Sequence, residues 1–188
     1  MSFNVGKQAL GSNTIWAADN GCFARPDLYS DTKYLKWLDR FPRSNCLFAT
    51  APDVLGDAEQ TLKRSLPLLP KIREEGYRAS FIGQDGATTD LPWNEFDCLF
   101  IGGTTAWKLS QAAGDLIAEA RQQGKWVHVG RVNSYKRLGM FNSMGAHSVD
   151  GTFIAFGPNK NLPKVLRWLR MCETANDNMI AYPERKKH

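Results

Sequence analysis

The sequence contains no long hydrophobic run, and this absence excludes several classes of protein. No apolar stretch approaches the roughly 20 residues that a transmembrane helix requires. The first residues, MSFNVGKQALGSN, lack the apolar segment of a secretory signal peptide. We therefore expect a protein that has no membrane partner and that works in the cytoplasm.

Cysteine is also scarce, and its spacing matters more than its number. The four residues, Cys22, Cys46, Cys98 and Cys172, are scattered, and no CxxC pair occurs. The histidines have no second histidine or cysteine three to five residues away. This pattern is unlike the clustered ligands of a zinc site and unlike the disulfide framework of a small secreted domain. The sequence predicts reduced thiols, no metal and no cofactor.

The composition that is present fits one globular domain with a slight excess of positive charge. Of the 188 residues, 43% are hydrophobic and 23% are charged, and the net charge is +5. Basic residues gather at 40–43, 131–137 and 160–187. This excess favours a polyanionic partner, although solvated surface charge explains it equally well. We expect residues 1–173 to form a single catalytic domain and residues 174–188 a loosely ordered basic tail.

Short apolar segments alternate along the chain with longer amphipathic segments. Strands are predicted at 14–18, 46–51, 79–83, 98–101, 126–130 and 147–149, the last continuing into 152–156. Helices are predicted at 31–41, 57–75, 105–123, 135–143 and 162–172, with Pro67 and Pro70 breaking or kinking the second. Such an alternation is typical of parallel strands joined by crossover helices.

The ends of the predicted strands distinguish between the two folds that this alternation allows. A Rossmann fold has a GxGxxG turn after its first strand, and this sequence has none. Instead, nearly every predicted strand ends in a polar or glycine-containing motif, namely ADNG, APD, GQDG, GGTT, VGR and VDG. Functional residues at many strand ends are typical of barrels, and 188 residues are few for eight units. The sequence predicts an α/β fold, a shortened or incomplete (β/α) TIM-like barrel of parallel strands.

Several groups at these strand ends suit chemistry at a glycosidic bond. The candidates are Asp19, Asp53, Gln84 with Asp85, Gly102 with Gly103, Arg131 and Asp150. Retaining glycosyl transfer uses one carboxylate to attack the anomeric carbon and a second, about 5–5.5 Å away, to move the proton. A carboxylate, an amide and backbone N–H groups also suit the polar edge of a purine. Each candidate also has an ordinary explanation, because Asp caps helices, Gly-Gly forms tight turns and Gln can be a satisfied loop amide.

Six short motifs, in order, resemble those of the tRNA-guanine transglycosylases. ADNGCF at 18–23 is similar to the DSGGF motif, and PD at 52–53 to the guanine-recognising aspartate. IGQDG at 82–86 resembles VQGG, IGG at 101–103 is similar to the IGG loop, and HVG at 128–130 resembles MGVG. The segment 145–150 is similar to the G-x-D-x-F-D stretch that ends in the nucleophile. The resemblance covers residues 14 to about 157.

The departures from this pattern indicate a particular branch of the superfamily. The tRNA enzymes carry a CxCxxC…H zinc site that this chain lacks, and Asn20 and Cys22 stand where the family has Ser and Gly. The chain, which is also shorter, most resembles the small phage DpdA-type enzymes that place 7-deazaguanines in DNA. The resemblance implies a DNA-guanine transglycosylase with two partners, DNA and a free base such as preQ0. If the chain is phage-encoded, it would act in the cytoplasm of the bacterial host.

The resemblance also implies which residues perform the chemistry and hold the polymer. Asp150 would attack C1′ of the target nucleotide, and Asp19 would transfer the proton of the leaving and entering bases. The basic residues Arg131, Lys136 and Arg137 would hold backbone phosphates. A homodimer is left open.

A second group of residues would bind the base. Asp53, Gln84, Gly102 and Gly103 would read its polar edge, and Phe23 would stack on its face. Two other functions remain open. One is a nucleoside or nucleic-acid N-glycosidase, which would use water in place of the second base. The other is a non-catalytic module that binds nucleic acid.

Overall fold

The computed structural model describes residues 14–24 and 26–175. Of the basic tail predicted at 174–188, residues 176–188 lie outside the described ranges, and the last helix extends to Ala175. Within the described ranges, no helix is both long enough and apolar enough to cross a membrane.

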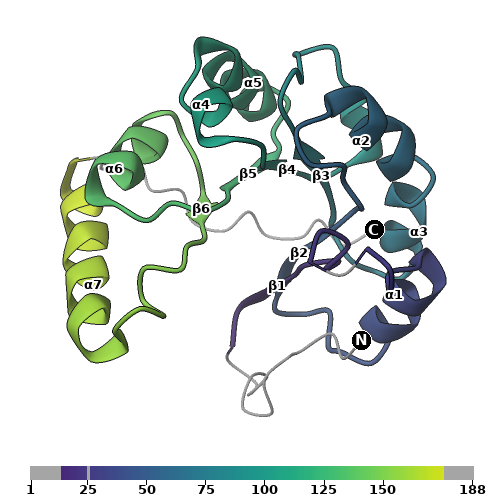
Figure 1. The fold of residues 1–188 in the computed structure, drawn as a ribbon, viewed down its shortest axis with the longest axis horizontal. Helices are drawn as coiled ribbons and strands as arrows, with labels where there is room; N and C mark the ends of the chain where they lie inside the picture. The colour runs from purple at the N-terminus through teal and green to yellow at the C-terminus, as the bar shows by residue number, and fades with distance from the viewer. Residues whose placement is uncertain (1–13, 25, 176–188) are drawn as a thin grey trace.

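Six short parallel strands form one curled sheet. They are β1 Trp16–Ala18, β2 Cys46–Thr50, β3 Ala79–Gly83, β4 Cys98–Ile101, β5 Trp126–Val129 and β6 Ser148–Val149. Each strand pairs in parallel with the next one in the sequence, so the order is β1-β2-β3-β4-β5-β6. Among the described residues β1 and β6 are edge strands, and the sheet forms a half-barrel with the helices on its outside (Figure 1). The predicted incomplete (β/α) barrel is confirmed.

Five of the seven described α-helices begin where the sequence supplies a capping side chain. Their bounds are α1 Asp31–Leu38, α2 Ala58–Ser65, α3 Leu69–Glu74, α4 Thr105–Lys108, α5 Gln111–Gln122, α6 Tyr135–Ser143 and α7 Pro158–Ala175, with a 3-10 turn η1 at Trp93–Glu95. The N-cap side chains that accept a backbone N–H are Ser30, Asp57, Thr104, Ser110 and Ser134. Such caps satisfy backbone donors that have no partner within the helix. The break predicted near Pro67 and Pro70 separates α2 from α3.

Two of the predicted elements differ from those observed. The helix expected at 105–123 is two helices, because the Ser110 side chain accepts the Ala113 N–H and starts α5 as a new helix. The strand expected at 152–156 is wrong, since that segment forms turns. Its Phe153 backbone is held by side chains, with its N–H donating to Asn133 Oδ1 and its carbonyl accepting from Asn161 Nδ2.

The two faces of the sheet have different roles. Side chains that point outward from the strands pack against the helices in the main hydrophobic core, as Phe81, Leu99 and Val127 do. Side chains on the concave face include Phe100 and His128, whose ring centroids are 4.6 Å apart. The core therefore fastens the helices to the sheet, while the concave face is free to carry other chemistry.

Strand register aligns the concave face into rows. Ile82, Phe100, His128 and Ser148 are partners across β3 to β6. Because side chains alternate between faces with a period of two, the next row on the same face consists of Gln84, Gly102, Gly130 and Asp150. This row lies just past the carboxyl ends of the strands, where barrel enzymes place their active sites.

Candidate active site

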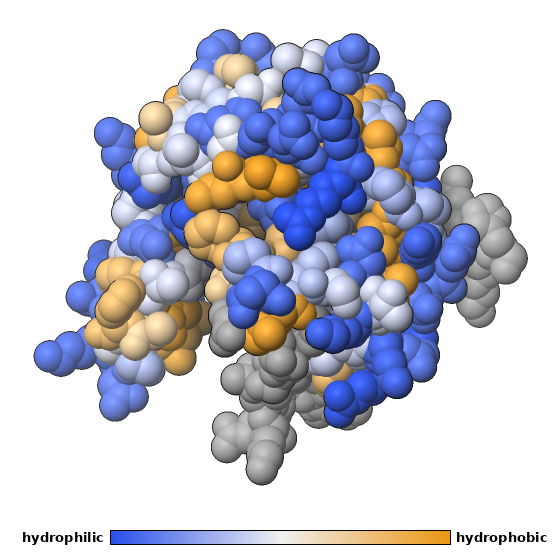
Figure 2. Space-filling view, turned by 45° about the vertical axis from the view of Figure 1, so that its right-hand side comes forward, coloured by the Kyte–Doolittle hydropathy of each residue, from blue (hydrophilic) through white to orange (hydrophobic). Residues whose placement is uncertain are grey.

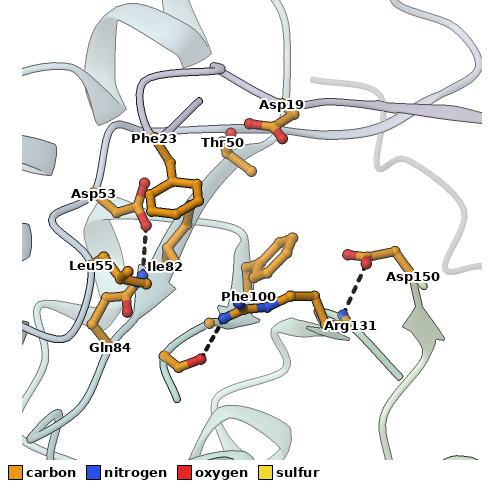
Figure 3. Close-up of a pocket in the computed structure, with 13 residues that line it drawn as sticks. Asp19, Phe23, Thr50, Asp53, Leu55, Ile82, Gln84, Phe100, Arg131 and Asp150 are labelled. Atoms are coloured by element: carbon orange, nitrogen blue, oxygen red, sulfur yellow. Dashed lines mark hydrogen bonds between the residues drawn. The ribbon is translucent and has the colours of Figure 1, made fainter. Parts of the chain in front are cut away.

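A cavity of about 220 Å³ opens at the carboxyl ends of the strands (Figure 3). Residues following all six strands contribute to its lining, which comprises Asp19, Phe23, Thr50, Asp53, Leu55, Ile82, Gln84, Phe100, Gly102, Gly103, Gly130, Arg131 and Asp150. Eight of the ten residues predicted to form the site thus lie around one cavity. The other two, Lys136 and Arg137, lie in the first turn of α6 and do not line it.

The turn after β1 is fastened to β2 by the buried Asn20. Its side-chain amide donates to Thr50 Oγ1 (3.0 Å) and to the Ala51 carbonyl (2.9 Å), and its Oδ1 accepts the Cys22 N–H (2.7 Å). Asp19 remains exposed at the cavity, with Oδ1 accepting the Gly21 N–H (2.9 Å). Asn20 therefore fixes the turn that presents Asp19.

Asp53 is held in place by two neutral donors. The Cys22 thiol donates to Oδ1 (3.3 Å), and burial raises the pKa of that thiol to about 12, so it stays protonated. Gln84 Nε2 donates to Oδ2 (2.6 Å), while Gln84 Oε1 accepts the Gly56 N–H (3.1 Å). Because both ends of the buried Gln84 amide are engaged, its main role in this structure is to orient Asp53.

The loop after β4 approaches the cavity closely because it has glycines where side chains do not fit. A Cβ atom at Gly102 would lie 2.7 Å from Ile82 Cγ2. Gly103 has a φ of +70°, and its carbonyl accepts from Arg131 Nη2 (2.6 Å). Asp85 fixes Thr104, the residue after Gly103, because its carboxylate accepts the Thr104 N–H (2.7 Å) and hydroxyl (2.5 Å). Burial raises the pKa of Asp85, but these hydrogen bonds outweigh it and leave the pKa lowered.

Asp150 has a donor on each carboxylate oxygen. The Arg131 backbone N–H donates to Oδ1 (2.9 Å), and His128 Nε2 contacts Oδ2 (3.1 Å). Burial acts to raise the pKa of Asp150, but the hydrogen bonds from His128 and Arg131, with the nearby Lys108 charge, lower it overall. The side chain is half exposed. Asp150 is therefore an ionised carboxylate that faces the cavity.

The turn after β5, which supplies the donor to Asp150, is held by a buried lysine. Lys108 Nζ donates to the Gly130 carbonyl (2.5 Å), and Lys108 is only 4% exposed. Burial, reinforced by the positive charge of Arg131, lowers its pKa to about 8. Arg131 has a φ of +60° and is the one non-glycine residue with positive φ in the part of the chain that the structure describes.

His128 and Lys108 are site residues that sequence reasoning missed. His128 could have been found, because it lies two residues before Gly130, on the same face of its strand as the strand-end row. Lys108 gave no such signal, since it was assigned to a continuous helix whose break at Ser110 was not predicted. No three His, Cys, Asp or Glu side chains within the described ranges are grouped so that they could hold a metal ion.

Comparisons with known proteins bear on the fold alone. No family model and no curated protein matches the chain. Among solved structures, a tryptophan synthase from M. tuberculosis is 14% identical over 74% of this chain and 54% of that one, with a TM-score of 0.50. A tryptophan synthase from Pyrococcus furiosus is 14% identical over 84% and 63%, with a TM-score of 0.49. The chain thus spans little more than half the length of these structures, and the first likeness establishes a partial (β/α) TIM barrel.

Proposed function

We propose that this protein exchanges a guanine base in DNA for a 7-deazaguanine such as preQ0, through a covalent aspartyl–sugar intermediate. The observation that carries the proposal is that Asp19 and Asp150, from the two edge strands, line one cavity together with the fixed carboxylate of Asp53. Retaining transfer at a glycosidic bond uses two carboxylates, one as nucleophile and one for the proton, and Asp53 adds an acceptor for the base.

The first half of the reaction forms the intermediate. Asp150 is ionised and therefore has an electron pair available for C1′ of the target nucleotide. As the new C1′–O bond forms, the bond from C1′ to guanine N9 breaks. Asp19 delivers a proton to the departing base, so that guanine leaves as a neutral molecule.

The second half reverses these events with a different base. The incoming 7-deazaguanine loses its N9 proton to Asp19, and N9 attacks C1′. The C1′–O bond breaks, and its electron pair returns to Asp150. Each carboxylate ends in its starting state, and the reaction uses neither water nor an oxidant.

The wall of the cavity that carries Asp53 and Phe23 suits a single purine base. The volume of the cavity, about 220 Å³, is below the roughly 300–1,000 Å³ of pockets for drug-sized ligands. Asp53 accepts hydrogen bonds only, which suits the N1–H and amino group of a guanine edge. The ring of Phe23 is 64% exposed beside the cavity and can stack on the base. A guanine in a duplex would have to leave the base stack to reach this site.

The resemblance supports DNA as the polymer, and the positive charge supports a nucleic acid of either kind. The net charge is +5, and Arg131 lies at the cavity where a backbone phosphate of the flipped nucleotide would pass. Phosphate contacts of this kind contribute affinity without sequence preference.

The test is a base-exchange assay with radiolabelled guanine and purified DNA. Label should enter DNA, and mass spectrometry of the nucleosides should detect 7-deazaguanine after incubation with preQ0. Label entering tRNA but not DNA would contradict the choice of polymer. Abasic sites without label incorporation would indicate an N-glycosidase. If neither polymer changes, the proposed function is wrong.

A further inference from the structure

A chain of four side chains crosses β5 and β6 and ends at Asp150. Trp126 Nε1 donates to Ser148 Oγ (2.9 Å), Ser148 Oγ contacts His128 Nδ1 (2.8 Å), and His128 Nε2 contacts Asp150 Oδ2 (3.1 Å). His128 and Ser148 are register partners on neighbouring parallel strands. All four residues occupy alternate positions on the same face of the sheet, so the backbone itself sets their spacing.

The chemistry of the donors gives this chain a direction. An indole N–H can only donate, so Ser148 Oγ accepts from Trp126, and the serine hydroxyl proton is free to point at His128 Nδ1. An imidazole with one proton that accepts at Nδ1 must carry its proton on Nε2. That N–H then points at Asp150 Oδ2.

Packing holds the imidazole in this orientation. His128 is 7% exposed. Its ring centroid is 4.6 Å from that of Phe100 and 5.1 Å from that of Phe48. A ring confined between two aromatic side chains, with a partner at each nitrogen, has little freedom to turn away from the carboxylate.

We propose that His128 is a positioning residue for the nucleophile: its Nε2–H and the Arg131 backbone N–H hold the two Asp150 oxygens in one orientation at the cavity. This inference rests on the proposed function. Each oxygen keeps a further lone pair, so bond formation at C1′ does not require loss of either donor. When the ester breaks, the electron pair of the C1′–O bond returns to an oxygen that already faces a donor. No proton leaves His128 in either step.

Three substitutions at position 128 separate positioning from packing. His128→Phe keeps an aromatic ring and removes both nitrogens. His128→Gln keeps an amide N–H at about the position of Nε2, and His128→Asn keeps one only near Nδ1, where it can reach Ser148 but not Asp150. We expect kcat for guanine exchange to fall about 10- to 100-fold in the Phe and Asn variants, by analogy with outer partners of metal ligands. The Gln variant should recover most of the loss, and KM for the free base should not change in any of them.

Equal kcat values for the Gln and Phe variants would overturn the inference, whether both are lowered or both are normal. If the Phe variant does not fold, the comparison of Gln with Asn decides in the same way. Imidazole nitrogen NMR on the parent protein provides a readout that needs no activity. It should find the His128 proton on Nε2, and a proton on Nδ1 would overturn the inference. A parent protein that exchanges no base would instead contradict the proposed function, even with the Nε2–H form observed.

Discussion

The cavity holds two fixed carboxylates, and their surroundings differ. The carboxylate of Asp53, on the wall built by β1 to β3, accepts from a thiol and an amide, both uncharged, while the Asp53 carbonyl accepts from Arg64 (2.9 Å). Asp150, on the wall built by β4 to β6, has His128 on one oxygen and the nearby charge of Lys108, and its pKa is lowered. The first wall can present a defined shape to a base, whereas the second keeps a carboxylate ionised for reaction. Substitutions on each wall test this division.

The largest effect is expected from removing the nucleophile. Asp150→Ala should abolish base exchange and the covalent protein–DNA adduct, because no other carboxylate occupies that position in the cavity lining. Binding of free guanine, measured by calorimetry, should remain, since the Asp53 wall is unchanged. Asp90→Asn, in an exposed loop, is the matched control. An adduct trapped with Asp150→Ala would show that the nucleophile has been misassigned.

Lys108 allows a test of the wall built by β4 to β6 that measures protein stability and needs no activity. Its pKa is about 8 in the fold against 10.5 for an ordinary lysine. Below pH 8 it is charged in both states, and burial of the charge opposes folding. Between pH 8 and 10.5 the folded protein releases the proton first, so stability rises with pH. Relative to Lys108→Met, the parent should gain up to about 3 kcal/mol in free energy of unfolding across this window.

This gain is measured by denaturant unfolding of both proteins at pH 7 and at pH 10.5. Other groups titrate alike in the two proteins and cancel in the comparison. Lys164→Met, at an exposed position on α7, is the control and should show no such difference. A constant difference between parent and Lys108→Met at both pH values would mean that Lys108 is not desolvated in the fold.

Asp53→Asn tests the wall built by β1 to β3. Hydrogen bonds to a charged group contribute about 1.5–3 kcal/mol, so the Kd for free guanine should rise about 10- to 100-fold. The rate of adduct formation at saturating DNA should change much less than in the Asp150 variant. If Asp53→Asn abolished the adduct and left the affinity for free guanine intact, Asp53 would belong to bond formation and not to base binding.

The smallest effect is expected from the basic residues that lie off the cavity. Replacing Lys136 and Arg137 with alanine should weaken binding to all DNA sequences about equally. It should also flatten the dependence of log Kd on log salt by about 0.9 for each phosphate that the variant no longer neutralises. Fluorescence anisotropy with two unrelated oligonucleotides at several salt concentrations measures both. An unchanged slope would show that these two residues do not bind the polymer.

The fold and the cavity lining could be predicted because each strand carries its own signal. A polar or glycine motif after an apolar strand is local in sequence, and parallel strands bring such ends to one edge. The meeting of the two proposed catalytic carboxylates in one cavity could not be predicted from such local signals. Asp19 and Asp150 follow opposite edge strands, and only the curl of the sheet brings them to one cavity. Curl accumulates from strand twist and cannot be deduced from any single motif.

The site residues that were not predicted are those whose partners lie on other elements. His128 depends on the register between β5 and β6, and Lys108 on a helix break that a Ser110 cap produces. The segment 152–156 is short and apolar like a strand, but beyond β6 no described strand pairs with it. A short apolar run predicts that its residues could be buried and not whether a neighbouring strand exists.

Apolar side chains are unevenly distributed over the surface of the molecule (Figure 2). Exposed apolar side chains remain on α7 and just before it, including Phe156, Leu162 and Leu166. Figure 2 shows apolar residues grouped among hydrophilic ones on one face of the molecule. Apolar atoms contribute much of the accessible surface of any folded protein, so exposed side chains of this kind do not by themselves indicate a partner.

The left-handed backbone of Arg131 has a consequence for the evolution of the site. A non-glycine residue in this conformation costs about 1 kcal/mol or more, and a glycine there costs almost nothing. Arg131→Gly would relieve this strain but would also remove the guanidinium that donates to the Gly103 carbonyl, so its two effects on stability oppose each other. Evolution at this position therefore weighs a backbone conformation that favours glycine against a hydrogen bond that needs the arginine side chain.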